Sequence, residues 1–318
     1  MDLDNNVDIL EDEIVSYGTE LLSILLKDRT TGRNIIWATN DYSDLGELYL
    51  STCEIELNAI SGRNTKIIQP RITKHETKQA SRTREKAEVF TPSWICNEQN
   101  NLVDEQWFGR CDVFNIQGQQ TWTATTEKIV FPDIKGKSWQ KYVGANRMEI
   151  TCGEAPYLVS RYDTVTGNPI ELQSRIGLLD RKMRVVNENT DTEKDWFKWT
   201  ERAFQSIYGY EYQGDNLLLA RENLLYTFID NMKFIWNRKP TVQEMKRIAT
   251  IVSWNLWQMD GISYTVPLRA IGERVIQLSL FENVTDAIEN INRSYCKIKD
   301  WRSKVIIEYI TLVEGEAS

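Results

Sequence analysis

The stretch at residues 147–159, RMEITCGEAPYLV, constrains the fold of this chain more than any other segment. A short apolar run that contains Glu149 tightens through Gly153 and Ala155, then continues into a second apolar run. This order predicts a strand, a tight turn and the start of a helix, an arrangement in which backbone amides face a ligand. A plain strand-to-helix turn of an α/β domain explains the stretch equally well, so the rest of the chain has to decide.

Composition bounds the class of protein. A chain of 318 residues with 41% hydrophobic residues can bury one large core or two modest ones. The formal net charge of −8 argues against a uniformly basic nucleic-acid coat, but it leaves room for a local basic segment. The five cysteines are widely spaced and form no CxxC pair, so we expect reduced thiols and no metal site. His75 is the single histidine, which removes most hydrolase mechanisms of the triad type.

Nothing in the chain is apolar enough to enter a membrane. The N-terminal stretch MDLDNNVDILEDE is acidic and lacks the basic and apolar regions of a signal peptide. A run of about 18 apolar residues, the length needed to span a bilayer, does not occur. We therefore expect a soluble, cytoplasmic protein with no membrane partner.

Residues 61–86 form a basic arm. Cations in series exchange with the counterions of a nucleic-acid backbone, so the arm predicts contact with the phosphates of double-stranded DNA. A solvated basic surface segment is the alternative. The arm contains two glutamates and the cations Arg63, Lys66, Arg71, Lys74, Lys78, Arg82, Arg84 and Lys86.

Hydrophobic periodicity and turn residues predict the other elements. Helices are expected over residues 13–27, 174–186, 193–205, 216–228 and 284–294, and strands over 34–39, 148–151, 207–211, 248–256 and 304–309. Residues 106–146, rich in aromatics, glycine and threonine, indicate irregular structure around short strands. Pro92 should hold Thr91 in extended geometry, after which Ser93 can cap a helix.

Carboxylates follow the predicted strands of the central region. Glu211 ends the second strand and Asp260 follows the third, so both should meet Glu149 in one crevice at the carboxyl edge of a parallel sheet. A carboxylate after a glycine turn suits ribose hydroxyls, because it can accept both hydroxyl hydrogens. Asp260 beside Trp257 suits an adenine ring, which the carboxylate can bind through its amine while the indole stacks.

Four segments, in order, resemble N6-adenine DNA methyltransferases of the kind called restriction endonuclease subunit M. They are FTP from residue 90, EITCGEAPYLV from 149, YGYEYQGDNLLLAR from 208 and WNLWQMDG from 254, in a gamma-like motif order that covers roughly residues 15–300. The resemblance implies S-adenosyl-L-methionine as the cofactor. It implies these cofactor-binding residues: Phe90, Thr91 and Pro92 on the methionine side, Glu149, Gly153 and Ala155 at the turn, Glu211 on the ribose and Asp260 on the adenine amine. Ala155 stands where the family has a second glycine.

The resemblance also implies a fold and a division into domains. We expect an α/β fold with a doubly wound, mostly parallel sheet of the S-adenosylmethionine-dependent methyltransferase type, preceded by an N-terminal helical and basic region. The expected parts are an N-terminal region with the basic arm (1–86), a methyltransferase-like cofactor-binding domain (87–270) and a C-terminal extension (271–318).

The catalytic signature of that family, an Asn or Asp followed by two prolines and an aromatic, is not found. Beyond Asp260 the chain has a single proline, Pro267, and the nearest look-alike is Asn255 with Trp257. The signature matters because it holds the amine of an extruded base and stacks on its ring. We therefore leave the catalytic residues unassigned.

Three functions stay open. The chain is an adenine methyltransferase subunit of a restriction–modification system, with a divergent catalytic loop or one supplied by a partner subunit. Alternatively, it is a non-catalytic methyltransferase-like module that binds DNA, the cofactor or a partner subunit. The third possibility is an enzyme that uses S-adenosylmethionine on a substrate other than DNA. A nuclease pattern, with an acidic residue ahead of a Glu-x-Lys pair, is not evident.

Overall fold

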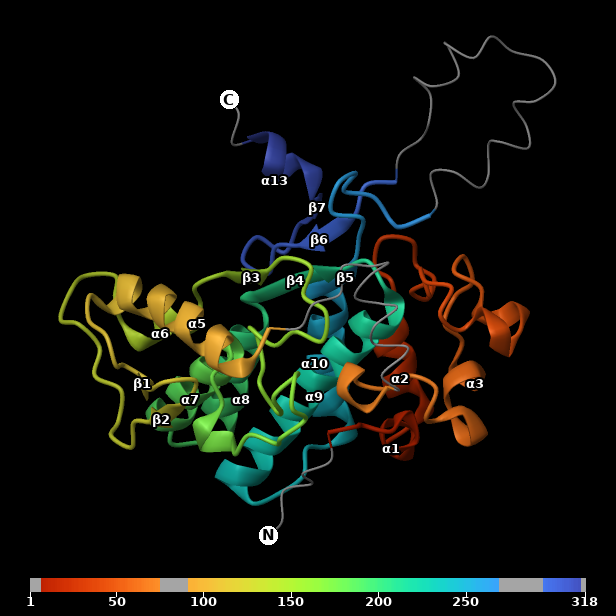
Figure 1. The fold of residues 1–318 in the computed structure, drawn as a ribbon. Helices are drawn as coiled ribbons and strands as arrows, with labels where there is room; N and C mark the ends of the chain where they lie inside the picture. Colours follow the sequence, from red (N-terminus) through yellow and green to blue (C-terminus); the bar gives the residue numbers. More distant parts are fainter. Residues whose placement is uncertain (1–6, 75–90, 269–293, 316–318) are drawn as a thin grey trace.

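The computed structural model describes residues 7–74, 91–268 and 294–315 as a mixed α/β protein (Figure 1). Its helices are α1 (Glu11–Ser16), α2 (Thr19–Leu26), α3 (Leu57–Ile60), α5 (Ser93–Phe108), α6 (Trp139–Val143), α7 (Leu178–Asn189), α8 (Glu193–Phe204), α9 (Gly214–Trp236), α10 (Val242–Asn255) and α13 (Ile310–Glu314). Its strands are β1 (Asn115–Gln117), β2 (Trp122–Ala124), β3 (Arg147–Glu149), β4 (Ile207–Glu211), β5 (Leu256–Gln258), β6 (Lys297–Lys299) and β7 (Ile306–Glu308). Short 3-10 helices are η1 (Ser43–Leu45), η2 (Glu47–Tyr49), η3 (Gly62–Asn64), η4 (Arg71–Thr73) and η5 (Leu172–Ser174).

The central sheet has three parallel strands in the order β3–β4–β5. Strands predicted near 148–151 and 207–211 are therefore confirmed as neighbours, and the strand predicted over 304–309 is confirmed as β7. Two antiparallel hairpins, β1–β2 and β6–β7, complete the strand pairings of the described residues. The predicted helix over 284–294 lies outside the described residues except for its last residue, Ser294.

The prediction of a third strand over residues 248–256 is wrong, because helix α10 occupies this segment up to Asn255 and β5 begins only at Leu256. A capping box starts the helix: the Thr241 hydroxyl accepts a hydrogen bond from the Glu244 amide (3.3 Å), and the Glu244 carboxylate accepts one from the Thr241 amide (2.7 Å). The Arg238 guanidinium, which also bonds Glu244, is the main reason that the pKa of this carboxyl falls to about 2.

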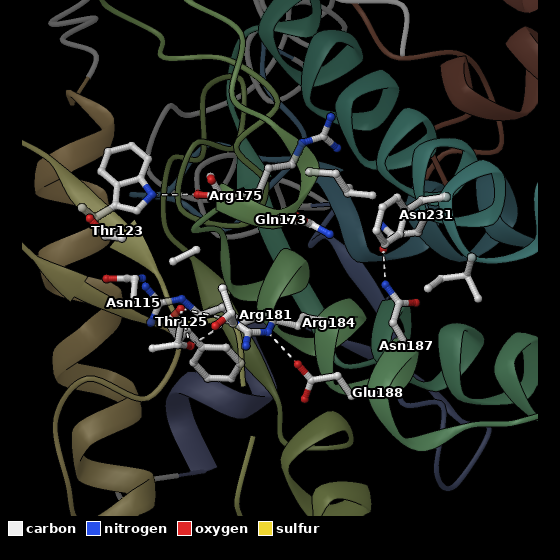
Figure 2. Close-up of a pocket in the computed structure, with 18 residues that line it drawn as sticks. Asn115, Thr123, Thr125, Gln173, Arg175, Arg181, Arg184, Asn187, Glu188 and Asn231 are labelled. Carbon is white, nitrogen blue, oxygen red and sulfur yellow. Dashed lines mark hydrogen bonds and ion pairs between the residues drawn. The ribbon is translucent and has the colours of Figure 1, made fainter. Parts of the chain in front are cut away.

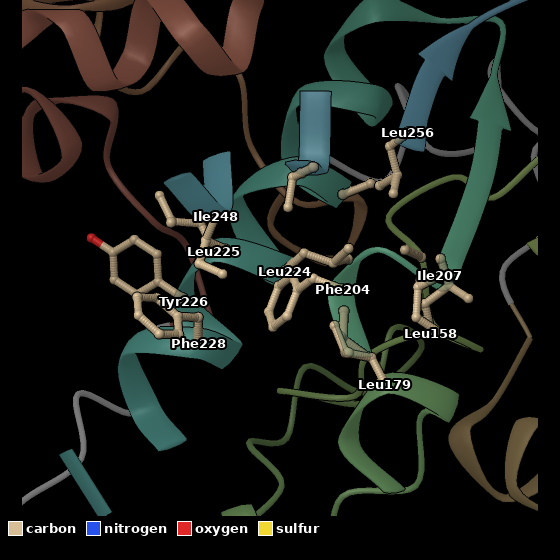
Figure 3. Packing of buried hydrophobic residues seen from close by; sticks show 14 of the residues in the cluster. Leu158, Leu179, Phe204, Ile207, Leu224, Leu225, Tyr226, Phe228, Ile248 and Leu256 are labelled. Atoms are coloured by element: carbon tan, nitrogen blue, oxygen red, sulfur yellow. The ribbon is translucent and has the colours of Figure 1, made fainter. Parts of the chain in front are cut away.

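The two faces of the sheet are covered differently. Side chains alternate along a strand, so Ile207 and Leu256 face the helices and enter the main core with Phe204 and Leu224 (Figure 3). Tyr210 and Trp257 face the opposite way and pack under the β6–β7 hairpin, in a separate apolar cluster that includes Ile298. Helices cover one face of this small sheet and a hairpin covers the other (Figure 1).

The N-terminal segment is joined to the sheet through its backbone. Residues 34–39 were predicted as a strand, but they form only two isolated bridges, Asn34 with Lys27 and Ile36 with Glu54, and Ala38 is left-handed with a φ of 52°. The Gln258 side chain accepts from the Ile36 amide (2.9 Å) and donates to the Ile36 carbonyl (2.8 Å). Gly214 at the start of α9 lies so close that a Cβ there would be 2.1 Å from the Ile36 carbonyl oxygen. This approach requires glycine at position 214.

Glu222 makes the stability of this fold depend on pH. It is 0% exposed on α9, and neither carboxyl oxygen has a hydrogen-bond partner. Burial, followed by repulsion from Glu11 on α1, raises the pKa of Glu222 well above its ordinary value. Burial likewise raises the pKa of Glu11 to about 9. Because both folded-state pKa values are raised, the stability is fully present below about pH 4.5 and is lost as pH rises toward the folded values.

We expect the melting temperature to fall between pH 5 and pH 8, with a slope of up to about 1.4 kcal/mol per pH unit for each proton released. Glu222→Gln should raise the melting temperature at pH 8 and flatten the profile, because a neutral amide needs no proton. Glu98→Gln, on the exposed side of α5, serves as the control and should leave the profile unchanged. Parallel profiles for wild type and Glu222→Gln would contradict the assignment.

Candidate cofactor crevice

Three of the predicted carboxylates gather at the carboxyl edge of the sheet. Glu149 is the last residue of β3 and Glu211 the last of β4, and Asp260 lies just beyond β5. In the ladder Glu149 is opposite Gly209, and Glu211 is opposite Gln258. The chain after β5 stays close, because the Met259 amide donates to the Glu211 carbonyl (3.0 Å). Glu149, Glu211 and Asp260 therefore follow neighbouring strands at one edge of the sheet, with β5 in place of the third strand predicted over 248–256.

The turn after β3 differs from the one predicted. Thr151, Gly153 and Ala155 have φ values of 50°, 53° and 64°, so left-handed residues alternate along it. Residues 150–160 form successive turns and loop, and the predicted helix start is wrong. A turn of alternating hand directs its amides inward as an anion-binding concavity. Here the acceptor is part of the chain, since the Gly153 amide donates to Glu211 Oε2 (2.9 Å).

Glu211 and Glu149 form a desolvated pair of acids. Burial raises the pKa of Glu211, against the opposing effect of hydrogen bonds from the amides of Gln213 and Gly153. Burial also raises the pKa of Glu149 well above its usual value, and the nearby Glu211 adds to this. Glu149 Oε1 accepts from the Tyr157 amide (3.4 Å), whereas Oε2 is buried without a partner. This edge of the sheet therefore holds one hydrogen-bonded carboxyl, Glu211, and one carboxyl oxygen of Glu149 without a partner.

The third carboxylate, Asp260, is held in a local turn. Its Oδ1 accepts from the Ile262 amide at 2.8 Å. Trp257, the predicted stacking partner, is only 2% exposed, and its ring lies 5.3 Å from that of Tyr309 under the C-terminal hairpin. Its indole is therefore not available to an adenine on the Asp260 side. Tyr212 is the aromatic that sequence reasoning missed: burial, then the charge of Asp260, raises the pKa of its half-buried hydroxyl.

Thr91 and Pro92 lie at the start of α5, beside the turn, whereas Phe90 is outside the described residues. Pro92 is the N-cap, and the predicted cap by Ser93 is wrong: Ser93 is the first helical residue, and its amide donates to Asp163 Oδ2 (2.8 Å). The pKa of the Tyr157 hydroxyl is raised mainly by burial and lowered by a hydrogen bond with Thr91. The Tyr157 amide also donates to Glu149, so Tyr157 contacts both Thr91 and Glu149.

Asn255, the catalytic look-alike, lies at the other edge of the sheet. Its amide nitrogen donates to the carbonyls of Phe204 (3.0 Å) and Ile207 (2.9 Å), and its oxygen accepts from the Trp301 indole (2.7 Å). These bonds tie α8, β4 and the C-terminal hairpin together at the amino ends of the strands. Asn255 is therefore a structural residue on the side away from Glu211.

Part of the basic arm is used inside the protein. Lys74 pairs with Asp215 at the start of α9 (3.2 Å), and the lysine side chain is only 6% exposed. Lys74 is therefore not free to contact phosphate, against the prediction for the arm. Lys78, Arg82, Arg84 and Lys86 lie outside the described residues.

Two of the cavities in the described part of the chain are lined by no predicted site residue. The first, of about 570 Å³, lies between the β1–β2 hairpin, α7 and α9 (Figure 2). Its polar groups bond one another, as in Arg184–Glu188 (2.7 Å), Asn187–Asn231 (2.8 Å) and Trp122–Ser174 (2.7 Å). The second, of about 620 Å³, lies at the amino edge of the sheet between α6 and α8.

No known protein-family model matches this chain, and no curated protein or solved structure matches it significantly. Within the described ranges, acidic, cysteine and histidine side chains form no cluster of three or more that could hold a metal ion. None of the helices described is both long enough and apolar enough to cross a bilayer.

The left-handed backbone at Ala155 gives a direct test of the turn. Ala155→Gly should raise the free energy of unfolding by about 1 kcal/mol, because only the alanine Cβ is strained at φ 64°. Ala220→Gly, within α9, is the matched control and should lower it by about 1 kcal/mol or more. Urea denaturation of both variants checks the pair, and a destabilised Ala155→Gly would show that the turn has a different backbone.

Proposed function

We propose that this chain is the S-adenosyl-L-methionine-binding subunit of a DNA adenine N6-methyltransferase of the restriction–modification type, completed by a partner subunit that supplies the catalytic loop. One observation carries the proposal. Strands β3, β4 and β5 are parallel and adjacent in motif order, with Glu149, Glu211 and Asp260 at one edge. An order with the second strand central agrees with one half of a doubly wound sheet, whose ligands bind outside the carboxyl ends of the strands.

The turn after β3 adds support. In the resembling family a second glycine stands at the position of Ala155, and the backbone here is left-handed, as a glycine would favour. The cofactor would lie along the turn, with its ribose against Glu211 and its adenine near Asp260 and Tyr212. Each carboxylate oxygen has two lone pairs, so Glu211 can keep its bonds from Gly153 and Gln213 while accepting ribose hydroxyls. Thr91 and Pro92 would flank the methionine end, together with Phe90.

A non-catalytic methyltransferase-like module, binding DNA, cofactor or a partner subunit, is the second candidate. Two observations favour it: the Asn/Asp-Pro-Pro-aromatic signature is missing from the sequence, and the side chain of Asn255 is fully used in the fold. The two candidates share the crevice and differ in methyl transfer.

Cofactor binding is tested by calorimetric titration of the full chain with S-adenosyl-L-methionine. Removing a buried, charge-assisted pair of hydrogen bonds costs about 2 kcal/mol or more, so Glu211→Gln should weaken binding by roughly thirtyfold. Asp260→Asn should weaken it less, because stacking persists. Asp191→Asn, in the exposed turn before α8, should bind like wild type. Circular dichroism establishes that each variant is folded, and equal affinities of wild type and Glu211→Gln would refute the crevice.

Methyl transfer separates the two candidates. With labelled cofactor and genomic DNA that lacks adenine methylation, we expect the pure chain to incorporate little or no label at N6, because no loop of the family type holds an extruded base. Addition of the partner subunit should restore incorporation if the chain belongs to an active enzyme. Rapid incorporation by the chain alone would show that a divergent loop is competent and that no partner is required.

A further inference from the structure

The cavity at the amino edge of the sheet is lined by an excess of cations. Lys141 comes from α6, Lys198 and Arg202 from α8, and Arg302 from the turn between β6 and β7. The carboxylate among its lining residues, Glu201, is already paired with Arg247 at 2.7 Å. The protein has a formal net charge of −8, so four cations around one cavity give this surface a charge opposite to that of the whole chain. We call this group of four residues the basic pocket.

Arg202 and Arg302 share one acceptor. Their Nη2 atoms lie 3.4 Å and 2.7 Å from the carbonyl oxygen of Gly144, which follows the last residue of α6. A carbonyl oxygen can accept two hydrogen bonds, so sharing it brings two like charges close together. Consistent with this, burial and then the charge of Arg302 lower the pKa of Arg202. The charge of Asp300 acts in the opposite direction and raises the pKa of Arg202, but among the described residues no carboxylate forms an ion pair with either guanidinium.

A buried lysine beneath the basic pocket responds to the same charges. Lys182 on α7 donates to the carbonyl and the hydroxyl of Ser206 at 3.3 and 2.6 Å, and it is 1% exposed. Its pKa lies well below the ordinary value because of burial first, and then because of repulsion from Arg147, Arg202 and Arg302. The positive potential therefore extends behind the pocket wall, and an anion would relieve it.

We propose that the basic pocket binds a phosphoryl group, carried by a nucleotide or by a nucleic-acid strand. Two guanidinium forks and two ammonium groups match a phosphate dianion, which has three acceptor oxygens and accepts bidentate bonds from arginine. Trp199 lines the same cavity and is partly buried, with the Trp139 ring 4.7 Å away and the Lys198 ammonium 6.0 Å from its ring centre, so a nucleotide bound at Lys198 would change the surroundings of the indole.

The basic pocket is distinct from the cofactor crevice. Helix α6 leads into β3 and helix α8 leads into β4, so the pocket lies at the amino ends of the strands, whereas Glu211 and Asp260 lie at the carboxyl edge. The inference does not rest on the proposed cofactor role, and either can fail alone.

The test uses the full chain and three probes at low ionic strength: pyrophosphate, ADP and a short duplex DNA. We expect saturable binding of pyrophosphate, and loss of about tenfold or more in affinity in Arg202→Gln and in Lys198→Gln. Lys194→Gln, an exposed lysine of α8 outside the pocket, is the matched control and should bind like wild type. Because Arg202→Gln removes a repelled charge, its melting temperature should be no lower than that of wild type.

The other two probes identify the carrier. ADP binding tighter than pyrophosphate, with a change in tryptophan fluorescence that is lost in Trp199→Leu, supports a nucleotide. DNA binding that weakens in Arg202→Gln while ADP does not bind supports a nucleic-acid strand. If none of the three probes binds, or if the pocket variants bind as tightly as Lys194→Gln, the proposal is overturned. Either result leaves S-adenosylmethionine binding at Glu211 to be judged separately.

Discussion

The buried guanidinium of Arg221 is the interaction on which the arrangement of the chain depends. From the middle of α9 it donates to the carbonyls of Leu256 (2.6 and 3.0 Å), Lys27 (3.1 Å) and Leu25. Helices α2 and α10 both end at this point, where their last carbonyls have no partners within the helix. Burial lowers the pKa of Arg221 to about 9, yet the surrounding carbonyls stabilise the charged form. Without that contact the N-terminal helices, α10 and β5 would lose a common anchor.

The sheet has two chemically different edges. After α10 ends at Arg221, the chain enters β5, which pairs with β4. Glu149, Glu211 and Asp260 then lie at the carboxyl edge of the three strands. The opposite edge receives the C-termini of α6 and α8, where cations are favoured. One small sheet therefore has an acidic edge with inward-pointing amides and a basic edge opposite to it. This separation follows from strand direction, because all three strands are parallel.

Sequence reasoning succeeded where the signal was local. Residues 207–211 and the long helix that follows were recognisable from alternation and from helical periodicity. The strand predicted over 248–256 was wrong. A short apolar run with Ile and Val is compatible with a buried strand and with a buried helix, and only the residues that precede it distinguish the two. The pattern Thr241-x-x-Glu244 was the available signal, because a capping box starts a helix and here it starts α10. Proline at 92 was read correctly as a boundary, but the capping carboxylate came from Asp163, far along the chain.

The sequence by itself determined which residues carry the candidate chemistry and in what order they follow the strands: Glu149 with its turn, then Glu211, then Asp260. Only the tertiary structure decided how they are used. The Gly153 amide bonds Glu211, Trp257 faces a hairpin made of C-terminal residues, and Arg302 meets Arg202 at Gly144. None of these contacts has a local pattern, because each joins segments that lie far apart in the chain. Their geometry is set by which faces and edges the packed helices leave open, and propensity and spacing carry no information about that.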